Sequence, residues 1–193
     1  MRVFAAFPLP PAVAAGIGSA FSSARKLAPR VRWVSSEAMH LTLHFFGEIP
    51  EDGISSFAPV FDDPDLRIPA IRTSLGEPGF FPSAGSPRVL WVGLRTGVDA
   101  MNAFWRSFTE RLEPLRKAGA PLSRWSPEAR GFAPHVTVAR AGSAPLSPQW
   151  AQGVSIPSGE FSITECVLFQ SVLGEGGARY VPLKTIPFPG GAA

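Results

Sequence analysis

Two short segments of the chain repeat one pattern of residue types. Residues 40–43 read His-Leu-Thr-Leu and residues 135–138 read His-Val-Thr-Val, and the two histidines lie 95 positions apart. Alternation of polar and apolar residues is typical of a half-buried β-strand. Side chains two residues apart in a strand point to the same face. Each segment should therefore present a histidine and a threonine together, with the apolar residues on the core side.

Two such strands supply the groups that act on a phosphodiester. Histidine gains or loses a proton near neutral pH, so two imidazoles beside one phosphorus atom can act as base and acid. Threonine hydroxyls can donate hydrogen bonds to the non-bridging oxygens, where charge builds up in the transition state. We therefore predict that His40 and His135 are catalytic and that Thr42 and Thr137 bind the phosphate. One copy of so short a pattern is common by chance; the pair, in a chain with three histidines, carries the prediction.

A metal site does not fit this pattern. His40 and His44 have the i, i+4 spacing of a helical zinc site, but the run from 41 to 46 is rich in strand-forming residues. On a regular strand their Cβ atoms would lie roughly 13 Å apart, too far for one ion. No acidic cluster lies near either motif in the sequence. We expect neither a metal nor another cofactor, and we expect His44 at the rim of the cleft face.

Other kinds of site find little support. The chain has no Gly-x-Ser-x-Gly, Gly-x-Gly-x-x-Gly or Walker pattern, so serine hydrolase and nucleoside triphosphate sites are not indicated. The one cysteine, Cys166, excludes an internal disulfide and lies in an apolar run that predicts a core position. The net charge of +3 permits a nucleic-acid partner without requiring one. No apolar run is long enough to span a bilayer, so we expect a cytoplasmic protein without a membrane partner.

The elements that must position the two motifs are short strands and helices in alternation. Strands are expected at 2–7, 31–34, 39–46, 68–75, 89–94, 135–139, 161–163, 166–172 and 179–184. Helices are expected at 11–26, 51–58, 97–113 and weakly at 146–153, with loops at 76–87 and 119–134. Pro114 should end or kink the third helix. This mixture of elements and short connections predicts an α+β fold with antiparallel pairing.

The motifs and their surroundings resemble a known family. The segments at 31–34 (Val-Arg-Trp-Val), 40–48, 87–93 and 134–140 together resemble the 2H phosphoesterases, and among them the RNA 2′,3′-cyclic phosphodiesterases, also called 2′-5′ RNA ligases. The similarity covers nearly the whole chain, from about residue 1 to 188. It implies one domain over residues 1–193 made of two similar lobes, with antiparallel sheets lining a central cleft and helices outside. Each lobe would supply one motif strand.

The same resemblance implies a reaction and its roles. RNA 2′,3′-cyclic phosphate ends, tRNA fragments among them, would be hydrolysed to 2′-phosphates without a cofactor, and RNA ends could also be joined by a 2′-5′ bond. His40 would give a proton to the leaving 3′-oxygen, and His135 would activate water. Thr42 and Thr137 would hold the phosphate. We expect a monomer that has RNA as its partner.

Two further residues are candidate substrate contacts. Arg140 matches a family position that is often arginine, but a regular strand would point it away from His135, so it can bind phosphate only where the strand ends or bulges. Phe132, in a loop beside the second motif, is the aromatic residue that we predict as a contact for a terminal base. Trp33, Phe46 and Trp91 are alternatives, and core packing is the competing expectation for all four residues, least so for Phe132.

Two other functions stay open at this point. One is an RNA- or nucleotide-binding module that does not turn over its ligand, which the presence of both histidines and both threonines disfavours. The other is an enzyme that opens a cyclic phosphate on a small nucleotide, such as an ADP-ribose cyclic phosphate.

Overall fold

The structure, a computed structural model, describes residues 1–83, 85–119, 121–127, 131–174 and 177–190. The strands are β1 (Arg2–Pro8), β2 (Arg32–Trp33), β3 (His40–Glu48), β4 (Ile71–Phe81), β5 (Val89–Leu94), β6 (His135–Arg140), β7 (Glu160–Ile163), β8 (Glu165–Gly174) and β9 (Gly177–Pro187). The α-helices are α1 (Pro11–Ala20), α2 (Ser22–Leu27), α3 (Ala58–Phe61) and α4 (Val98–Ala118). Short 3-10 helices lie at Ser36–Ala38, Asp52–Phe57, Pro64–Leu66 and Pro148–Ala151.

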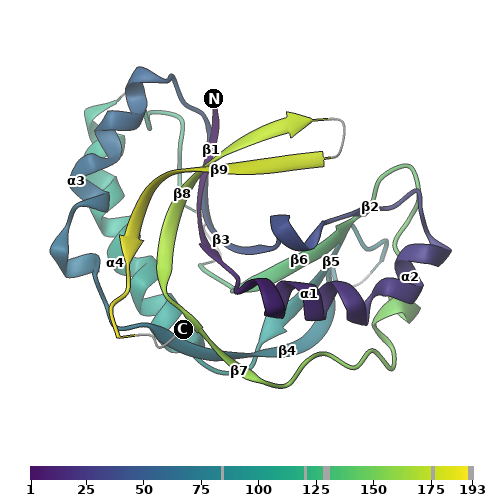
Figure 1. Cartoon of the computed structure of the whole chain (residues 1–193). Coiled ribbons are helices and arrows are strands. Elements are labelled where there is room, and N and C mark those ends of the chain that lie inside the picture. Colours follow the sequence, from purple (N-terminus) through teal and green to yellow (C-terminus); the bar gives the residue numbers. More distant parts are fainter. Residues whose placement is uncertain (84, 120, 128–130, 175–176, 191–193) are drawn as a thin grey trace.

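The strands form one antiparallel sheet in the order β7-β4-β5-β6-β3-β1-β8-β9, and β2 pairs with β6. The sheet curls, with α3 and α4 along one side and α1 and α2 at the opposite end (Figure 1). This architecture confirms the predicted α+β class with antiparallel pairing. Within the described residues, no helix combines the length and apolar character needed to cross a bilayer.

The two motif strands, β3 and β6, are neighbours in the middle of this sheet. On one side of them lie β1, β8 and β9, and on the other lie β5, β4 and β7. Two lobes with one motif each would divide the sheet in this way. That the lobes are related by pseudo-symmetry remains a prediction.

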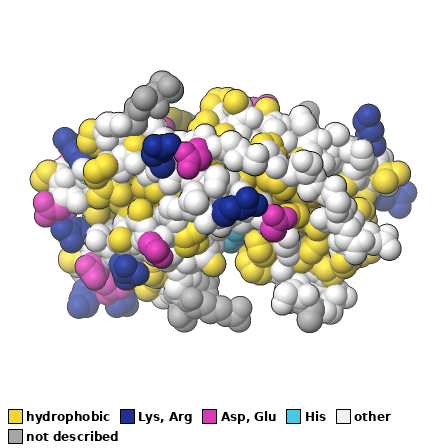
Figure 2. Space-filling view, turned by 90° about the horizontal axis from the view of Figure 1, so that it is seen from below, with side chains coloured by type: hydrophobic (Ala, Val, Ile, Leu, Met, Phe, Trp, Pro, Cys, Tyr) yellow, Lys and Arg dark blue, Asp and Glu magenta, His cyan; other side chains and the backbone are white. Residues whose placement is uncertain are grey.

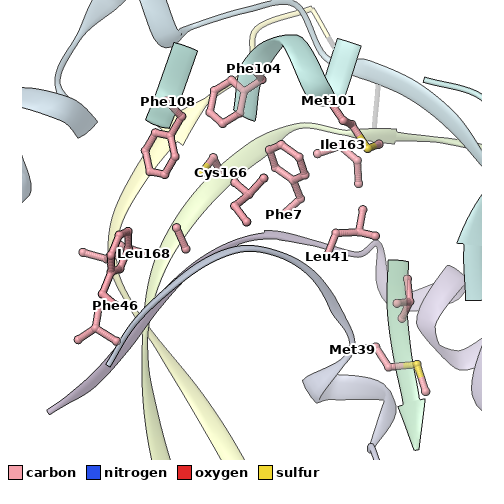
Figure 3. Packing of buried hydrophobic residues seen from close by; sticks show 14 of the residues in the cluster. Phe7, Met39, Leu41, Phe46, Met101, Phe104, Phe108, Ile163, Cys166 and Leu168 are labelled. Atoms are coloured by element: carbon pink, nitrogen blue, oxygen red, sulfur yellow. The ribbon is translucent and has the colours of Figure 1, made fainter. Parts of the chain in front are cut away.

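The core lies between the sheet and α4 (Figure 3). The buried residues Met101, Phe104, Phe108 and Leu112 recur at helical spacing, as the sequence predicts for this helix. The ring of Phe104 lies 5.4 Å from that of Phe7 in β1, between ring centroids. Cys166 is fully buried in the same cluster, which confirms its predicted core position.

Several predicted boundaries were wrong. The expected helix at 11–26 is interrupted at Phe21, whose side chain is buried, so the chain forms α1 and α2 instead. Helix α4 continues through Pro114, which is exposed, rather than ending there. The helix ends at Ala118 and is followed by Gly119, whose φ of 103° suits glycine. The helices expected at 51–58 and 146–153 are mainly 3-10 turns.

Strand β4 extends into the segment at 76–81 that was expected to be a loop. The reason is a close approach between strands, which composition alone does not reveal. The indole of Trp91 in β5 lies over Gly79, and a Cβ at that position would collide with the ring. Glycine is therefore part of the strand pairing here rather than a sign of a turn.

Candidate active site

The register between β3 and β6 brings the two motifs together. Leu41 pairs with Val136, and both side chains are fully buried on the core side of the sheet. The residues that flank them in each strand must therefore point to the other, inner face. The side chains of the two histidines and two threonines are partly exposed on that face.

Across these antiparallel strands, His40 lies beside Thr137, and Thr42 lies beside His135. The two histidines thus occupy a diagonal, for which residues are typically about 7–8 Å apart and their Cβ atoms somewhat closer. Imidazoles at this spacing can contact a phosphate group from two sides. Within the described part of the chain, neither threonine hydroxyl is engaged in a hydrogen bond to another protein group. Both hydroxyls can therefore donate to a ligand.

The two imidazoles are held in the same way. The Nδ1 atom of His40 lies 2.8 Å from the carbonyl oxygen of Ala38, and that of His135 lies 2.8 Å from the carbonyl oxygen of Ala133. A carbonyl oxygen only accepts, so Nδ1–H is the donor in both rings. Each neutral imidazole therefore carries its lone pair on Nε2. This arrangement leaves Nε2 as the atom that takes or gives a proton.

Aromatic side chains pack on both histidines. The contacts are Phe4 and Tyr180 on His40, at 4.9 and 5.1 Å between ring centroids, and Phe81 and Trp91 on His135, at 5.1 and 6.3 Å. Packing of this kind limits rotation of the imidazoles and withdraws water from them. The sequence did not indicate these contacts, because Phe4, Phe81 and Tyr180 come from strands remote from the motifs.

Burial lowers the pKa of both imidazoles in the free protein. It lowers the pKa of His40 to about 4, against the Ala38 carbonyl, which raises it, while the charges of Arg140 and His135 lower it further. Burial also lowers the pKa of His135, opposed by the Ala133 carbonyl and assisted by Arg140. Both rings therefore favour the neutral form more strongly than a free histidine does.

Arg140 lies on the inner face because β6 bulges. Thr137 pairs with Trp91 and Ala139 pairs with Leu90, which leaves Val138 as an extra residue in β6. A bulge of one residue exchanges the faces of all residues beyond it. Val138 and Ala139 are consequently both buried, and Arg140 is exposed on the side of His135. Within the described residues its guanidinium forms no ion pair with the protein, so it can bind an anion.

A matching bulge in β3 places Phe45 on the inner face. Thr42 pairs with Ala6 and His44 pairs with Ala5, so Leu43 is the extra residue. Phe45 is 58% exposed, and its ring lies 5.8 Å from that of Phe4. Regular alternation would have put Phe45 in the core. The only signal in the sequence was the run of bulky residues at 44–46, which strict alternation cannot accommodate on one buried face.

The same bulge contradicts the expectation for His44, which is buried and not at the rim. Its side chain is 3% exposed on the core side, and its Nε2–H donates to the Thr109 hydroxyl oxygen at 2.8 Å, since that hydroxyl donates to the Trp105 carbonyl. Its ring packs on those of Trp105, Phe108 and Trp125. His40 and His44 therefore point to opposite faces of β3 and cannot share one metal ion.

Phe132 does not lie with the motif residues. Its ring stacks on Trp105 of α4 at a centroid distance of 6.2 Å and packs against the core. The structure thus gives no contact that supports its expected role as a base ligand. Phe132 precedes β6, which begins at His135, and its role as a base ligand remains a prediction.

Comparison with known proteins places this arrangement in a family. The family described as LigT-like phosphoesterase matches residues 7–91. An RNA 2′,3′-cyclic phosphodiesterase of Aeropyrum pernix is 30% identical over 160 residues, which cover 81% of this chain and 85% of that protein. A protein of the same name from Geobacillus stearothermophilus is 28% identical over 97% of this chain, which spans only 57% of that relative's length.

The likeness extends to solved structures. The crystal structure of TT0787 from Thermus thermophilus matches with a TM-score of 0.75 at 27% identity, over 98% of this chain and 99% of that one. Similarity of sequence and of fold thus runs through the two motif strands and the sheet around them. The chain belongs to the LigT-like family of 2H phosphoesterases, as its two motifs predict.

Proposed function

We propose that the protein hydrolyses the 2′,3′-cyclic phosphate at the end of an RNA chain to a 2′-phosphate, with His40 and His135 as the acid and the base. The observation that carries this proposal is the diagonal placement of two imidazoles whose Nδ1 atoms are occupied and whose Nε2 atoms are available. The names of the relatives support the same substrate class.

The reaction needs one proton transfer at each histidine. Nε2 of His135 accepts a proton from water as the water oxygen attacks phosphorus. The bond between phosphorus and the 3′-oxygen breaks, and Nε2–H of His40 gives its proton to that oxygen. The products are a 2′-phosphate and a free 3′-hydroxyl, and exchange with solvent returns both histidines to their starting states.

Binding of the phosphate prepares this reaction electrostatically. Thr42 and Thr137 donate hydrogen bonds to the non-bridging oxygens, and the Arg140 guanidinium pairs with their negative charge. An anion between the histidines opposes the effects that lower their pKa values in the free protein. His40 can then hold its proton near neutral pH, when the substrate is in place.

The terminal base of the substrate can bind on the same face of the sheet. The exposed face of Phe45 is available to stack a terminal base beside the reacting phosphate. If a 5′-hydroxyl of a second RNA took the position of the attacking water, the same acid and base would form a 2′-5′ bond. We propose this ligation as a secondary reaction of the site.

The test is turnover of adenosine 2′,3′-cyclic phosphate in the presence of EDTA, with the phosphate position in the product read by chromatography. The wild-type protein should form the 2′-phosphate. His40→Ala and His135→Ala should each lower kcat by roughly 10²–10⁴-fold. The matched control is His44→Gln, which changes the third histidine but retains a donor for Thr109, and it should stay within a few-fold of wild type.

Each alternative has a distinct outcome. Tight binding of the nucleotide without turnover would indicate a binding module. Faster turnover of ADP-ribose cyclic phosphate than of oligoribonucleotides would indicate a small-nucleotide enzyme. Formation of a 3′-phosphate would contradict the proposed direction of bond cleavage.

A further inference from the structure

The inner face of the sheet continues beyond the motif residues toward the hairpin of β8 and β9. There, Arg2 of β1 pairs with Ser171 of β8, and Ser171 pairs with Tyr180 of β9. These three residues form a row across three strands. Strands β1 and β8 pair without a bulge from Arg2 to Ala6, so Arg2 shares the face of Phe4.

Phe4 connects this row to the reacting centre. Its ring lies 4.9 Å from the imidazole of His40 and 4.8 Å from the ring of Tyr180, between centroids. Tyr180 also contacts His40 directly, edge to face, at 5.1 Å. Tyr180 therefore connects the proposed phosphate site to the inner-face row, at whose other end Arg2 lies further along the sheet.

The charges of Arg2 and Arg140 both act on the Tyr180 phenol. Burial raises the pKa of the Tyr180 phenol, while the charges of Arg140 and Arg2 both lower it. The phenol is thus within range of both guanidinium groups. Glu48, which is opposite Arg2 in β3, forms an ion pair with the Met1 ammonium at 3.6 Å. Within the described part of the chain, Arg2 forms no ion pair, so its charge is free to meet an anion.

The spacing suits a second phosphate of one RNA chain. Pro8 is opposite His40, and the six residues from Pro8 back to Arg2 span roughly 20 Å of strand. The lengths of the side chains shorten that gap. A stacked strand advances by about 3.4 Å per nucleotide, so the remaining distance corresponds to a few nucleotides. From a cyclic end, the chain can extend only toward its 5′ side.

The charged side chains on one face of the molecule (Figure 2) do not form an extended basic surface that would bind RNA along its length. On the face shown in Figure 2, Lys and Arg side chains alternate with Asp and Glu, and only a small area of histidine is visible. That face offers no continuous basic surface. A discrete contact on the inner face would recognise the RNA backbone without such a surface.

We propose that Arg2, Ser171 and Tyr180 form a second phosphate subsite, which binds the RNA backbone on the 5′ side of the reacting end and makes the protein prefer oligoribonucleotides to mononucleotides. Arg2 would pair with the phosphate, the Ser171 hydroxyl would donate to it, and the Tyr180 ring would support the intervening nucleotide. The proposal rests on the proposed function.

The test compares adenosine 2′,3′-cyclic phosphate with a hexaribonucleotide that ends in the same group. Arg2→Gln should lower kcat/KM for the hexamer by about 10-fold, as expected for one charge-assisted contact, and leave the mononucleotide within twofold. The dependence of log KM for the hexamer on log salt should weaken by about 0.7, the slope for one contact to a single strand. The matched control is Arg179→Gln, which removes the same charge next to Tyr180 in β9 but on the opposite face. It should change kcat/KM for neither substrate by more than twofold.

The outcomes separate this proposal from the proposed function. Equal losses on both substrates, no loss on the hexamer, or the same loss from Arg179→Gln would overturn the subsite. Failure of the wild-type protein to turn over the mononucleotide would overturn the proposed function instead. In that case, the affinity for a labelled hexamer ending in a 2′-phosphate still tests the subsite: Arg2→Gln should weaken it about 10-fold relative to Arg179→Gln, and an equal affinity of the two variants would refute it.

Discussion

From His40 in β3 and from His135 in β6, six consecutive residues follow the same order of partly exposed, buried and exposed side chains. Both strands bulge after the threonine, at Leu43 and at Val138, and the sixth residue returns to the inner face. Regular alternation would have placed that sixth residue in the core. The shared geometry thus extends two residues beyond the motif that the sequence shows.

The two strands carry different residues at this sixth position. It is Phe45 in β3 and Arg140 in β6, so one strand offers an aromatic ring and the other a cation. The fifth residue differs as well: His44 in β3 forms a buried hydrogen bond to Thr109, whereas Ala139 in β6 only fills space. The two histidines that we propose as acid and base are therefore symmetric in position, while the residues proposed to orient a substrate are not. Unequal contacts allow the two histidines to take different roles.

The largest expected effect separates those roles. In hydrolysis of bis(p-nitrophenyl) phosphate, the leaving p-nitrophenolate needs no proton, so loss of the acid should matter little. His40→Ala should then lose far less activity on this ester than the roughly 10²–10⁴-fold expected on a cyclic phosphate, while His135→Ala should lose activity on both. Initial rates on the two substrates check this. Equal losses for His40→Ala on both would contradict its role as the acid, and the reverse pattern would exchange the two roles.

The next effect tests Arg140. Arg140→Gln should lower kcat/KM by about 10- to 100-fold through loss of a charge-assisted contact. It should also raise the pKa values of His40 and His135, because the Arg140 charge lowers both. The bell-shaped profile of kcat/KM against pH, which reports the free protein, should have its optimum below pH 6.5 in wild type and move upward in the variant.

The control for this prediction is Arg140→Lys. It retains the charge and should therefore retain the pH optimum. It should lose some activity, because lysine cannot form the bidentate hydrogen bond of arginine. A profile for Arg140→Gln that falls in height without moving would show that Arg140 does not act on the imidazoles.

A smaller effect tests Phe45. Phe45→Ala should lower kcat/KM for adenosine 2′,3′-cyclic phosphate by about 10-fold, within the range for loss of one base stack. A ribose 2′,3′-cyclic phosphate without a base should be turned over equally by variant and wild type. Leu27→Ala, which removes another exposed apolar side chain, serves as the control. An equal loss on the abasic substrate would mean that Phe45 supports the strand rather than the base.

The smallest effect on activity concerns His44, whose contribution is to stability. Burial lowers its pKa to about 4, so the folded protein binds a proton there less readily than the unfolded chain. Stability should therefore fall as pH drops from about 6.5 toward 4, by on the order of 3 kcal/mol from this group. Histidines 40 and 135 act in the same direction. Denaturant unfolding at pH 7 and pH 4.5 should show a smaller difference for His44→Gln than for wild type, and an unchanged difference would contradict the assignment.

The sequence predicts those parts of the site that depend on residue type and local alternation. Both histidines and both threonines lie on one face as expected, and the apolar residues between them enter the core. The faces on which His44, Phe45 and Arg140 lie could not be predicted from local alternation. They follow from bulges that arise where β3 pairs with β1 and where β6 pairs with β5, and such pairing is not encoded within the motif itself.

Contacts between distant strands were beyond local reasoning for the same reason. Tyr180 and Phe4 reach His40 only because β9, β8 and β1 lie side by side with β3. Phe132, near the second motif in sequence, instead stacks on Trp105 of α4. Proximity in sequence therefore did not predict which aromatic residues surround the site, whereas the order of the strands in the sheet accounts for them.

The central claim is that His40 and His135 act together on one phosphate. NMR titration of the three histidine rings, with and without adenosine 2′-phosphate, tests it directly, since His44 provides an internal reference. One equivalent of this nucleotide should raise the pKa of both His40 and His135 and leave that of His44 unchanged. A response of only one of the two rings, or a second equivalent needed for the other, would contradict the account.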